Sequence, residues 1–158
     1  MTENIGNAAE QDNRTGLQQI EALHAGEYPV SPMTRLMPFS TLPPRKGALR
    51  FEAIPDKTHL NGFGVVHGGW AMTMLDNAMG LAAHSMVGPG EFCPSMETSV
   101  QFLDKISADG QTLKISANVT GQDGRMFSIE GAIETDAGKV LATGTSTCML
   151  IKPTSEAD

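Results

Sequence analysis

One stretch of the sequence decides the fold: HLNGFGVVHGGWAMTMLDNAMGLAAHSMV, residues 59–87. Its first part contains four glycines, which let the backbone turn tightly and let a ligand approach main-chain amides. From Trp70 onward the side chains are mostly apolar and show no strand-like alternation, and the run ends near Gly88-Pro89-Gly90. This length and these end signals predict one long, buried helix that follows a glycine-rich loop.

Strand patterns lie on both sides of this helix. Before it, residues 49–53 (LRFEA) alternate apolar and charged side chains, with the period of two that a half-buried strand requires. Alternation over 111–120 predicts a sheet with one dry face and one wet face. We therefore expect an α+β fold in which an antiparallel sheet wraps around the central helix. The strands predicted after the helix, separated by glycine-containing turns, are 97–103, 111–120, 125–134 and 140–151.

The N-terminal third of the chain is accessory to that fold. Leu17, Ile20 and Leu23 recur at helical spacing, and Thr15 is available as a cap, so a short amphipathic helix is expected. Five prolines between residues 28 and 46 exclude a regular helix there and favour an extended connector. The predicted organisation is a disordered tail (1–14), an N-terminal helix and proline-rich connector (15–46), one domain (47–153) and a short tail (154–158).

Composition excludes several classes of function. At 158 residues the chain suits one domain, and a net charge of −7 opposes sequence-independent binding to nucleic acid. Asp76, Asn77 and His84 interrupt the apolar stretch, so we expect no membrane span. The N-terminus lacks a secretory signal, which predicts a cytoplasmic protein. Cys93 and Cys148 are too few for a disulfide framework and lack metal-ligand spacing with any histidine, so both are expected to be reduced thiols.

Two features of the helix point to chemistry. Asp76 places a carboxylate in an apolar helix, which is costly unless the group is paired or functional. It could cap a loop or hydrogen-bond Ser and Thr side chains in the core, or it could serve as a catalytic base or nucleophile. If Gly69 starts the helix, its N–H is free and lies at the positive end of the helix dipole. Such an amide suits a developing oxyanion, as acyl transfer requires.

Together these residues resemble the PaaI-type (phenylacetic acid degradation) thioesterase family of the hotdog superfamily. The shared pattern is Asn61 in a glycine-rich loop, then His67-Gly68-Gly69, then Asp76 nine residues after the histidine. The resemblance extends from the Ala25-Gly26-x-x-Pro29 region to the final strand and is weaker outside the loop and helix. It implies a hotdog fold and hydrolysis of an acyl-CoA thioester without a metal or an organic cofactor.

The resemblance also implies a role for each matching residue. The amide of Gly69, helped by that of Gly68, would polarise the thioester carbonyl, and Asp76 would act as nucleophile or as general base for water. Asn61 and His67 would orient the thioester and the loop. A Ser or Thr near the start of the next strand would position water, and the candidates are Ser95 and, in a shifted register, Thr98.

Further expectations concern the ligand and competing functions. Lys105 and Arg125 are the candidate cations for the nucleotide end of CoA, although both could simply be solvated. The helix methionines, Met72, Met74, Met79 and Met86, are expected to be mostly core. One alternative is a non-catalytic acyl-CoA-binding or regulatory hotdog protein, and another is a hotdog hydratase or dehydratase. Aryl-acetyl, benzoyl and aliphatic acyl groups stay open.

The spacing of the two catalytic elements predicts a shared site. Gly69 and Asp76 lie seven residues apart, which is about 10 Å along a helix axis, so one carbonyl cannot meet both. They project from nearly the same face, and an antiparallel second copy would set its Gly69 opposite the first copy's Asp76. We therefore expect a homodimer with two equivalent sites. The family resemblance implies side-by-side dimers, many of which pair again into homotetramers.

Overall fold

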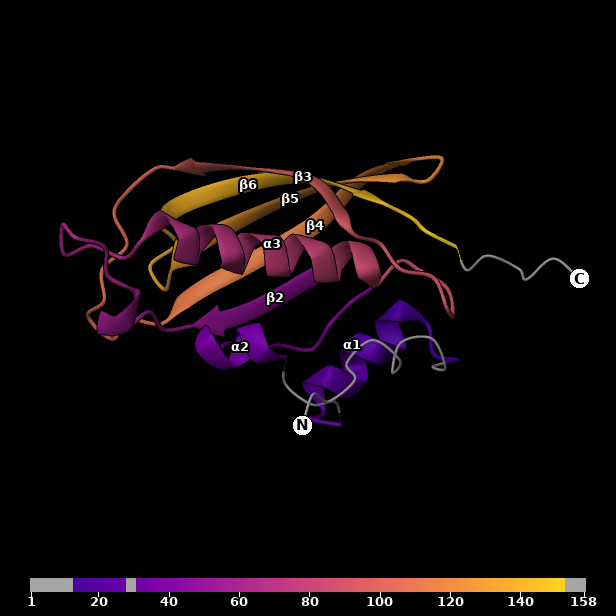
Figure 1. The fold of residues 1–158 in the computed structure, drawn as a ribbon, viewed down its shortest axis with the longest axis horizontal. Coiled ribbons are helices and arrows are strands. Elements are labelled where there is room, and N and C mark those ends of the chain that lie inside the picture. Colours follow the sequence, from indigo (N-terminus) through magenta and orange to yellow (C-terminus); the bar gives the residue numbers. More distant parts are fainter. Residues whose placement is uncertain (1–12, 28–30, 153–158) are drawn as a thin grey trace, which may run out of the picture.

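A six-stranded antiparallel sheet, in the order β1-β2-β4-β5-β6-β3, curves around one long helix in the computed structural model (Figure 1). The predicted hotdog arrangement, with a short helix before it, is confirmed. The structure describes residues 13–27 and 31–152, so the predicted tails fall almost wholly outside the described residues. The elements are α1 (Gly16–His24), α2 (Pro32–Leu36), β1 (Ser40–Thr41), β2 (Ala48–Ala53), a 3-10 turn η2 (Lys57–His59), α3 (Gly68–His84), β3 (Ser95–Phe102), β4 (Leu113–Asp123), β5 (Met126–Thr135) and β6 (Val140–Met149).

The core lies between α3 and the concave face of the sheet. On β4 the predicted alternation is confirmed, because Leu113, Ile115 and Ala117 are buried while the intervening side chains are exposed or half-buried. Gly131 on β5 lets α3 approach closely: a Cβ there would lie 3.2 Å from Met79 Cγ and 3.3 Å from Leu75 Cδ2. Close packing of helix on sheet therefore fixes where each residue of α3 faces.

Helix α3 differs from the prediction in three respects. It begins at Gly68, one residue early, with His67 as its N-cap. It ends at His84, before the expected Gly-Pro-Gly stop, because Ser85 Oγ donates to the carbonyl of Ala82 and accepts the N–H of Gly47, each at 2.7 Å. It is also not buried all round.

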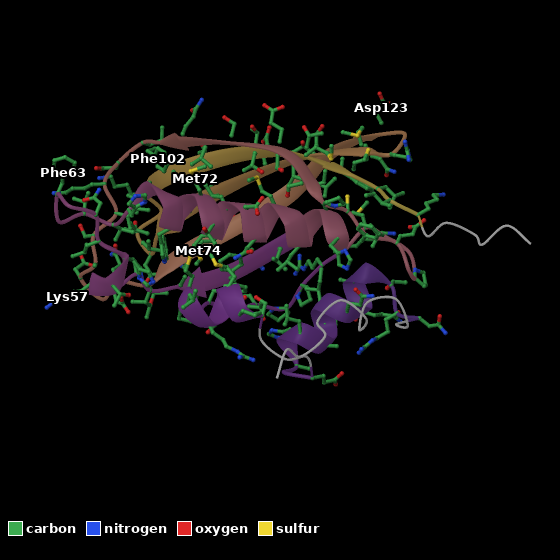
Figure 2. All side chains as sticks on the ribbon, in the orientation of Figure 1. Lys57, Phe63, Met72, Met74, Phe102 and Asp123 are labelled. Atoms are coloured by element: carbon green, nitrogen blue, oxygen red, sulfur yellow. The ribbon has the colours of Figure 1, made fainter. Side chains whose placement is uncertain are left out.

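One face of α3 is left open by its own chain. Met72 is 45% exposed and Asp76 is exposed, whereas Met74 and Met79 are fully buried and Met86 is partly buried (Figure 2 labels Met72 and Met74). The expectation of mostly core methionines is thus confirmed, with Met72 as the exception. The open face matters because it carries Asp76.

The N-terminal segment packs against the C-terminal end of α3. Thr15 caps α1 in a capping box with Gln18, as its position predicts. Gln19 Oε1 lies 2.8 Å from Nε2 of His84, which joins the two helices, and burial lowers the pKa of His84. Helix α1 therefore buttresses the end of α3 remote from the glycine-rich loop.

Two predictions, one about the proline-rich connector and one about the end of β4, are corrected. The proline-rich connector contains a regular helix after all, α2, because Pro32 occupies its first turn, where proline is tolerated, and Ser31 caps it. Strand β4 does not end before Gly121: a bulge after Val119 lets pairing continue to Asp123. The turn falls at Gly124, whose φ of +55° favours glycine.

In the part of the chain that the structure describes, no helix is long and apolar enough to cross a membrane.

Candidate active site

Asp76 lies on the open face of α3, opposite the start of β3. Its Oδ1 accepts hydrogen bonds from Ser95 Oγ at 3.1 Å and from Thr98 Oγ1 at 3.2 Å. Its Oδ2 has no hydrogen-bond partner among the described residues. Both hydroxyls that the sequence offered as alternatives therefore meet the carboxylate. They fix one oxygen and leave the other free for a ligand or for water.

A β-bulge explains why both hydroxyls reach Asp76. In a regular strand, residues three apart point to opposite faces. The pairing of β3 with β6 shifts register between Ser95 and Glu97, and this extra residue brings Ser95 and Thr98 to the same side. A bulge has no signature in the local sequence here, which is why the sequence could not decide between the two.

The amides at the start of α3 are arranged differently from expectation. The N–H of Gly69 is not free, because it donates to Nδ1 of its N-cap, His67, at 2.9 Å. The N–H of Gly68 has no partner among the described residues. Both amides lie at the positive end of the α3 dipole, which favours a developing negative charge. In this conformation the N–H of Gly68 can donate to a ligand. The N–H of Gly69 can do so only after its hydrogen bond to the His67 ring is broken.

Asn61 folds its own loop. Its Oδ1 accepts the N–H groups of Phe63 at 2.9 Å and Val65 at 3.4 Å, and its main-chain N–H bonds the carbonyl of Val65 at 2.8 Å. The predicted role of Asn61 in orienting the loop therefore has a physical basis within this chain. The turn leaves Phe63 at the tip, 93% exposed (Figure 2).

A hollow of about 280 Å³ lies beside the start of α3. Its lining includes His67, Gly68, Phe102 and Lys105. The Phe102 ring covers Gly68 so closely that a Cβ there would lie 3.1 Å from Cζ, and Phe102 is a lining residue that the sequence did not suggest. Lys105 makes no ion pair among the described residues, and its neighbour Asp104 pairs with Lys139.

The hydrogen bond from the Lys139 ammonium also lowers the pKa of the Asp104 carboxyl. Lys105 thus brings a cation to the hollow beside Gly68 without an ion-pair partner among the described residues. Arg125, the second predicted cation, follows Asp123 in the β4–β5 turn. That turn lies at the opposite end of the sheet from Phe63 and the start of α3 (Figure 2).

The other reactive side chains do not form a second centre. Cys93 and Cys148 are free and buried, as predicted for reduced thiols. Burial, with Cys148 alongside, raises the pKa of the Cys93 thiol to about 12, so it is protonated and a poor nucleophile. Within residues 13–27 and 31–152, no three His, Cys, Asp or Glu side chains are grouped to hold a metal ion.

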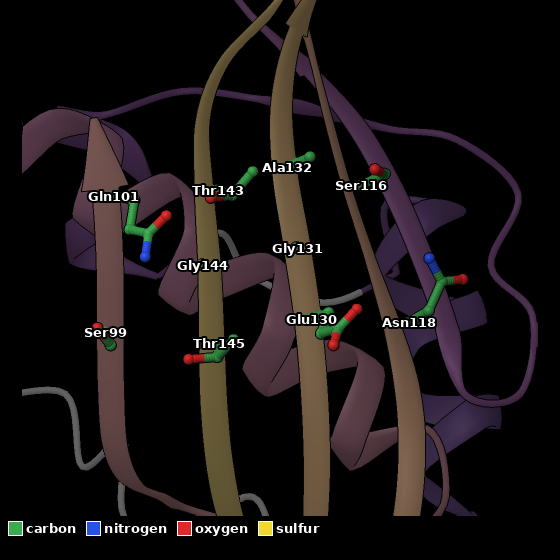
Figure 3. A pocket seen from close by; sticks show the side chains of 10 residues that line it. All are labelled: Ser99, Gln101, Ser116, Asn118, Glu130, Gly131, Ala132, Thr143, Gly144 and Thr145. Carbon is green, nitrogen blue, oxygen red and sulfur yellow. The ribbon is translucent and has the colours of Figure 1, made fainter. Parts of the chain in front are cut away.

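A second hollow, about 420 Å³, lies on the other face of the sheet. Figure 3 shows it with α3 behind the strands, so it is separated from Asp76 by the sheet itself. Small polar side chains dominate its lining, and Glu130 is its one charged group. All of its lining residues lie on strands, so no helix begins at this hollow.

Fold and site together define a hotdog protein with a carboxylate on the open face of its central helix and a glycine pair at that helix's start. The model of the thioesterase superfamily matches residues 63–142, just over half of the chain, from the tip of the glycine-rich loop into β6. The chain belongs to this superfamily.

Solved structures with the same fold include two proteins whose names refer to phenylacetic acid degradation. The E. coli PaaI protein of the phenylacetic acid degradation operon has a TM-score of 0.74 at 20% identity, covering 89% of this chain and 96% of its own. A phenylacetic acid degradation-related protein of Ralstonia eutropha JMP134 has a TM-score of 0.73 at 24% identity, covering 81% and 96%. A Streptococcus mutans protein, bound to acetyl-CoA, has a TM-score of 0.67 at 20% identity, covering 74% and 91%. At these identities the likeness shows the fold.

Proposed function

We propose that the protein hydrolyses an acyl-CoA thioester to the free acid and CoA. The observation that carries this is the asymmetric carboxylate of Asp76: Ser95 and Thr98 hold Oδ1, while Oδ2 is open. Because Asp76 is exposed in the single chain, its free Oδ2 is accessible to a ligand or to water. Membership of the thioesterase superfamily supports the reaction class, and the acetyl-CoA bound to the Streptococcus mutans protein supports the substrate class.

The chemistry divides between the two ends of the open helix face. The Gly68 amide, and that of Gly69 once His67 turns away, would bind the thioester oxygen and stabilise the oxyanion. With Asp76 as general base, Oδ2 takes a proton from water as the hydroxyl attacks the carbonyl carbon. The C–S bond then breaks, and the proton passes to the CoA thiolate. With Asp76 as nucleophile, Oδ2 attacks the carbonyl carbon, the C–S bond breaks and CoA leaves as its thiolate; water then hydrolyses the mixed anhydride, which restores the Asp76 carboxylate and supplies the proton for the thiolate.

A second copy of the chain would complete each site. Along one α3 the glycine pair and Asp76 are about 10 Å apart, too far to serve one carbonyl. The open face of α3 and the free edge of β3, the last strand of the sheet, lie beside each other, which favours a two-fold, side-by-side homodimer. The PaaI resemblance extends this to a homotetramer.

The cations fit the same arrangement. Lys105, beside the glycine pair, would contact the phosphates of CoA from the chain that supplies the amides. Arg125 lies at the other end of its own sheet. With antiparallel copies of α3, that end of the second chain faces the first chain's Lys105, so Arg125 would act from the second copy.

Subunit complementation tests the shared site. Asp76→Asn and Gly69→Val proteins, each expected to be inactive, are mixed under conditions that exchange subunits, and exchange is verified by mass spectrometry of differently tagged chains. Random pairing makes half of the dimers mixed, each with one intact site of two, so about a quarter of the wild-type activity per chain should return. No recovery despite verified exchange would place the whole site in one chain.

A substrate panel tests the reaction itself. Phenylacetyl, benzoyl, short aliphatic and medium aliphatic CoA thioesters are incubated with the protein, and CoA release is followed with a thiol reagent. Release above the rate of the Asp76→Asn protein supports hydrolysis. Tight binding without release from any of them would favour the alternative, a non-catalytic acyl-CoA-binding or regulatory protein.

A further inference from the structure

Two side chains of β6 lie directly behind the hydroxyls that hold Asp76. Ser146 Oγ lies 3.1 Å from Thr98 Oγ1 and donates to the carbonyl of Glu97 at 2.9 Å. Cys148 Sγ lies 3.9 Å from Ser95 Oγ. Ser146 is 5% exposed and Cys148 is fully buried, so water cannot replace either contact easily. The carboxylate thus has a second layer of support beneath it.

The proton count makes Ser146 the stronger of the two supports. The Thr98 hydroxyl has one hydrogen and two oxygen neighbours, Asp76 Oδ1 and Ser146 Oγ. A carboxylate is the better acceptor, so Thr98 donates to Asp76 and needs its own oxygen held by another group. The Ser146 hydroxyl also has a single hydrogen: donated to Thr98 Oγ1 it holds that hydroxyl directly, and donated to the Glu97 carbonyl it holds the strand at the residue before Thr98. A thiol at 3.9 Å is a weak donor by comparison.

We propose that Ser146 is a positioning residue that acts through Thr98 to hold Asp76 with Oδ2 presented to the substrate; this rests on the proposed hydrolytic function. Ser146 touches neither the substrate nor the reacting atoms. Its loss frees the Thr98 side chain to rotate, and the carboxylate then spends less time in the reactive orientation. The effect should fall on turnover and spare substrate binding, because the glycine amides and Lys105 do not contact Ser146.

The test compares two buried serines. Ser146→Ala should lower kcat about three- to tenfold, the factor of one neutral hydrogen bond, with KM unchanged within about twofold. Ser85→Ala removes a hydroxyl that is 2% exposed and also makes two hydrogen bonds, but lies at the far end of α3. It should lower the melting temperature and leave kcat unchanged. Melting curves establish the assay temperature at which both variants are folded.

A double-mutant cycle separates positioning from a general structural effect. Thr98→Val removes the hydroxyl through which Ser146 acts, so adding Ser146→Ala to it should change kcat by less than about twofold. Additive losses, equal losses in Ser146→Ala and Ser85→Ala, or wild-type kcat in Ser146→Ala would each overturn the inference. If the wild-type protein releases no CoA from any thioester, the proposed function fails; if Asp76→Asn itself keeps turnover, the catalytic role of Asp76 fails and the positioning role with it. If Asp76→Asn is inactive and Ser146→Ala is unimpaired, only the positioning role fails.

Discussion

Replacing Asp76 by asparagine changes the open oxygen and little else. Ser95 and Thr98 both donate to Oδ1, and the amide oxygen of asparagine can accept the same two bonds. The amide NH₂ then stands where Oδ2 stood. That nitrogen has no lone pair with which to take a proton from water or attack a carbonyl. The geometry therefore predicts that Asp76→Asn is inactive because a nitrogen replaces the one free carboxylate oxygen, Oδ2.

The expected magnitudes separate stability from activity. Asn and Asp have similar helix propensities, and two hydrogen bonds to a charged acceptor become bonds to a neutral one, so the free energy of unfolding should change by less than about 2 kcal/mol. Turnover should fall roughly 100- to 10,000-fold, as is typical for loss of a general base. This corresponds to about 3–5 kcal/mol of activation free energy.

Three measurements on one preparation decide the outcome: CoA release by a thiol reagent, acyl-CoA binding by calorimetry, and thermal unfolding. Asp123→Asn, which changes an exposed carboxylate at the end of β4, is the matched control and should behave as wild type (Figure 2). Turnover of Asp76→Asn within threefold of wild type would refute the reasoning and leave Asp76 as a carboxylate that merely binds two hydroxyls.

Two further predictions concern the surroundings of the site. Lys105→Ala should raise KM for acyl-CoA about two- to fivefold with kcat unchanged, and should have no effect on a pantetheine thioester that lacks the nucleotide; Lys114→Ala, whose ammonium pairs with Asp136, is the control. Gly16→Ala should lower the free energy of unfolding by about 1–3 kcal/mol, because the new Cβ overlaps the carbonyl oxygen of His84 and lies 2.9 Å from Val87 Cγ2. Gly121→Ala, with no atom within 4 Å of its Cβ, should change the melting temperature far less.

The fold was largely predictable because its signals are local and periodic. The alternation in β4, the apolar run of α3 and the capping threonine of α1 each reflect burial or hydrogen bonding within a few residues. The misses also have physical causes. Pro32 begins a helix because it occupies the first turn, and Ser85 ends α3 early through a bond to Gly47, far away in sequence.

The candidate site was less predictable because its contacts are made across the sheet. Ser95 and Thr98 were both named from sequence, but only the register of β3 on β6 brings them to one carboxylate. Ser146 gave no signal, since it lies in a strand where Thr143, Thr145 and Thr147 offer the same hydroxyl. The cap that His67 places on Gly69 depends on one side-chain rotamer, which no pattern in the chain specifies.

The open face of α3 connects these observations. A carboxylate in an apolar helix is a puzzle only if that face is buried, and within one chain Asp76 is exposed to water and costs little. Yet Met72 and Phe102 on the same side remain 45% and 55% exposed. Exposed apolar side chains do not stabilise a single chain, and they are typical of surfaces that bind a partner. Covering this side with a second copy would bury both apolar side chains and bring the second chain's glycine amides towards Asp76. The apolar residues would then stabilise the assembly that makes the carboxylate reactive, so loss of dimerisation and loss of turnover should coincide.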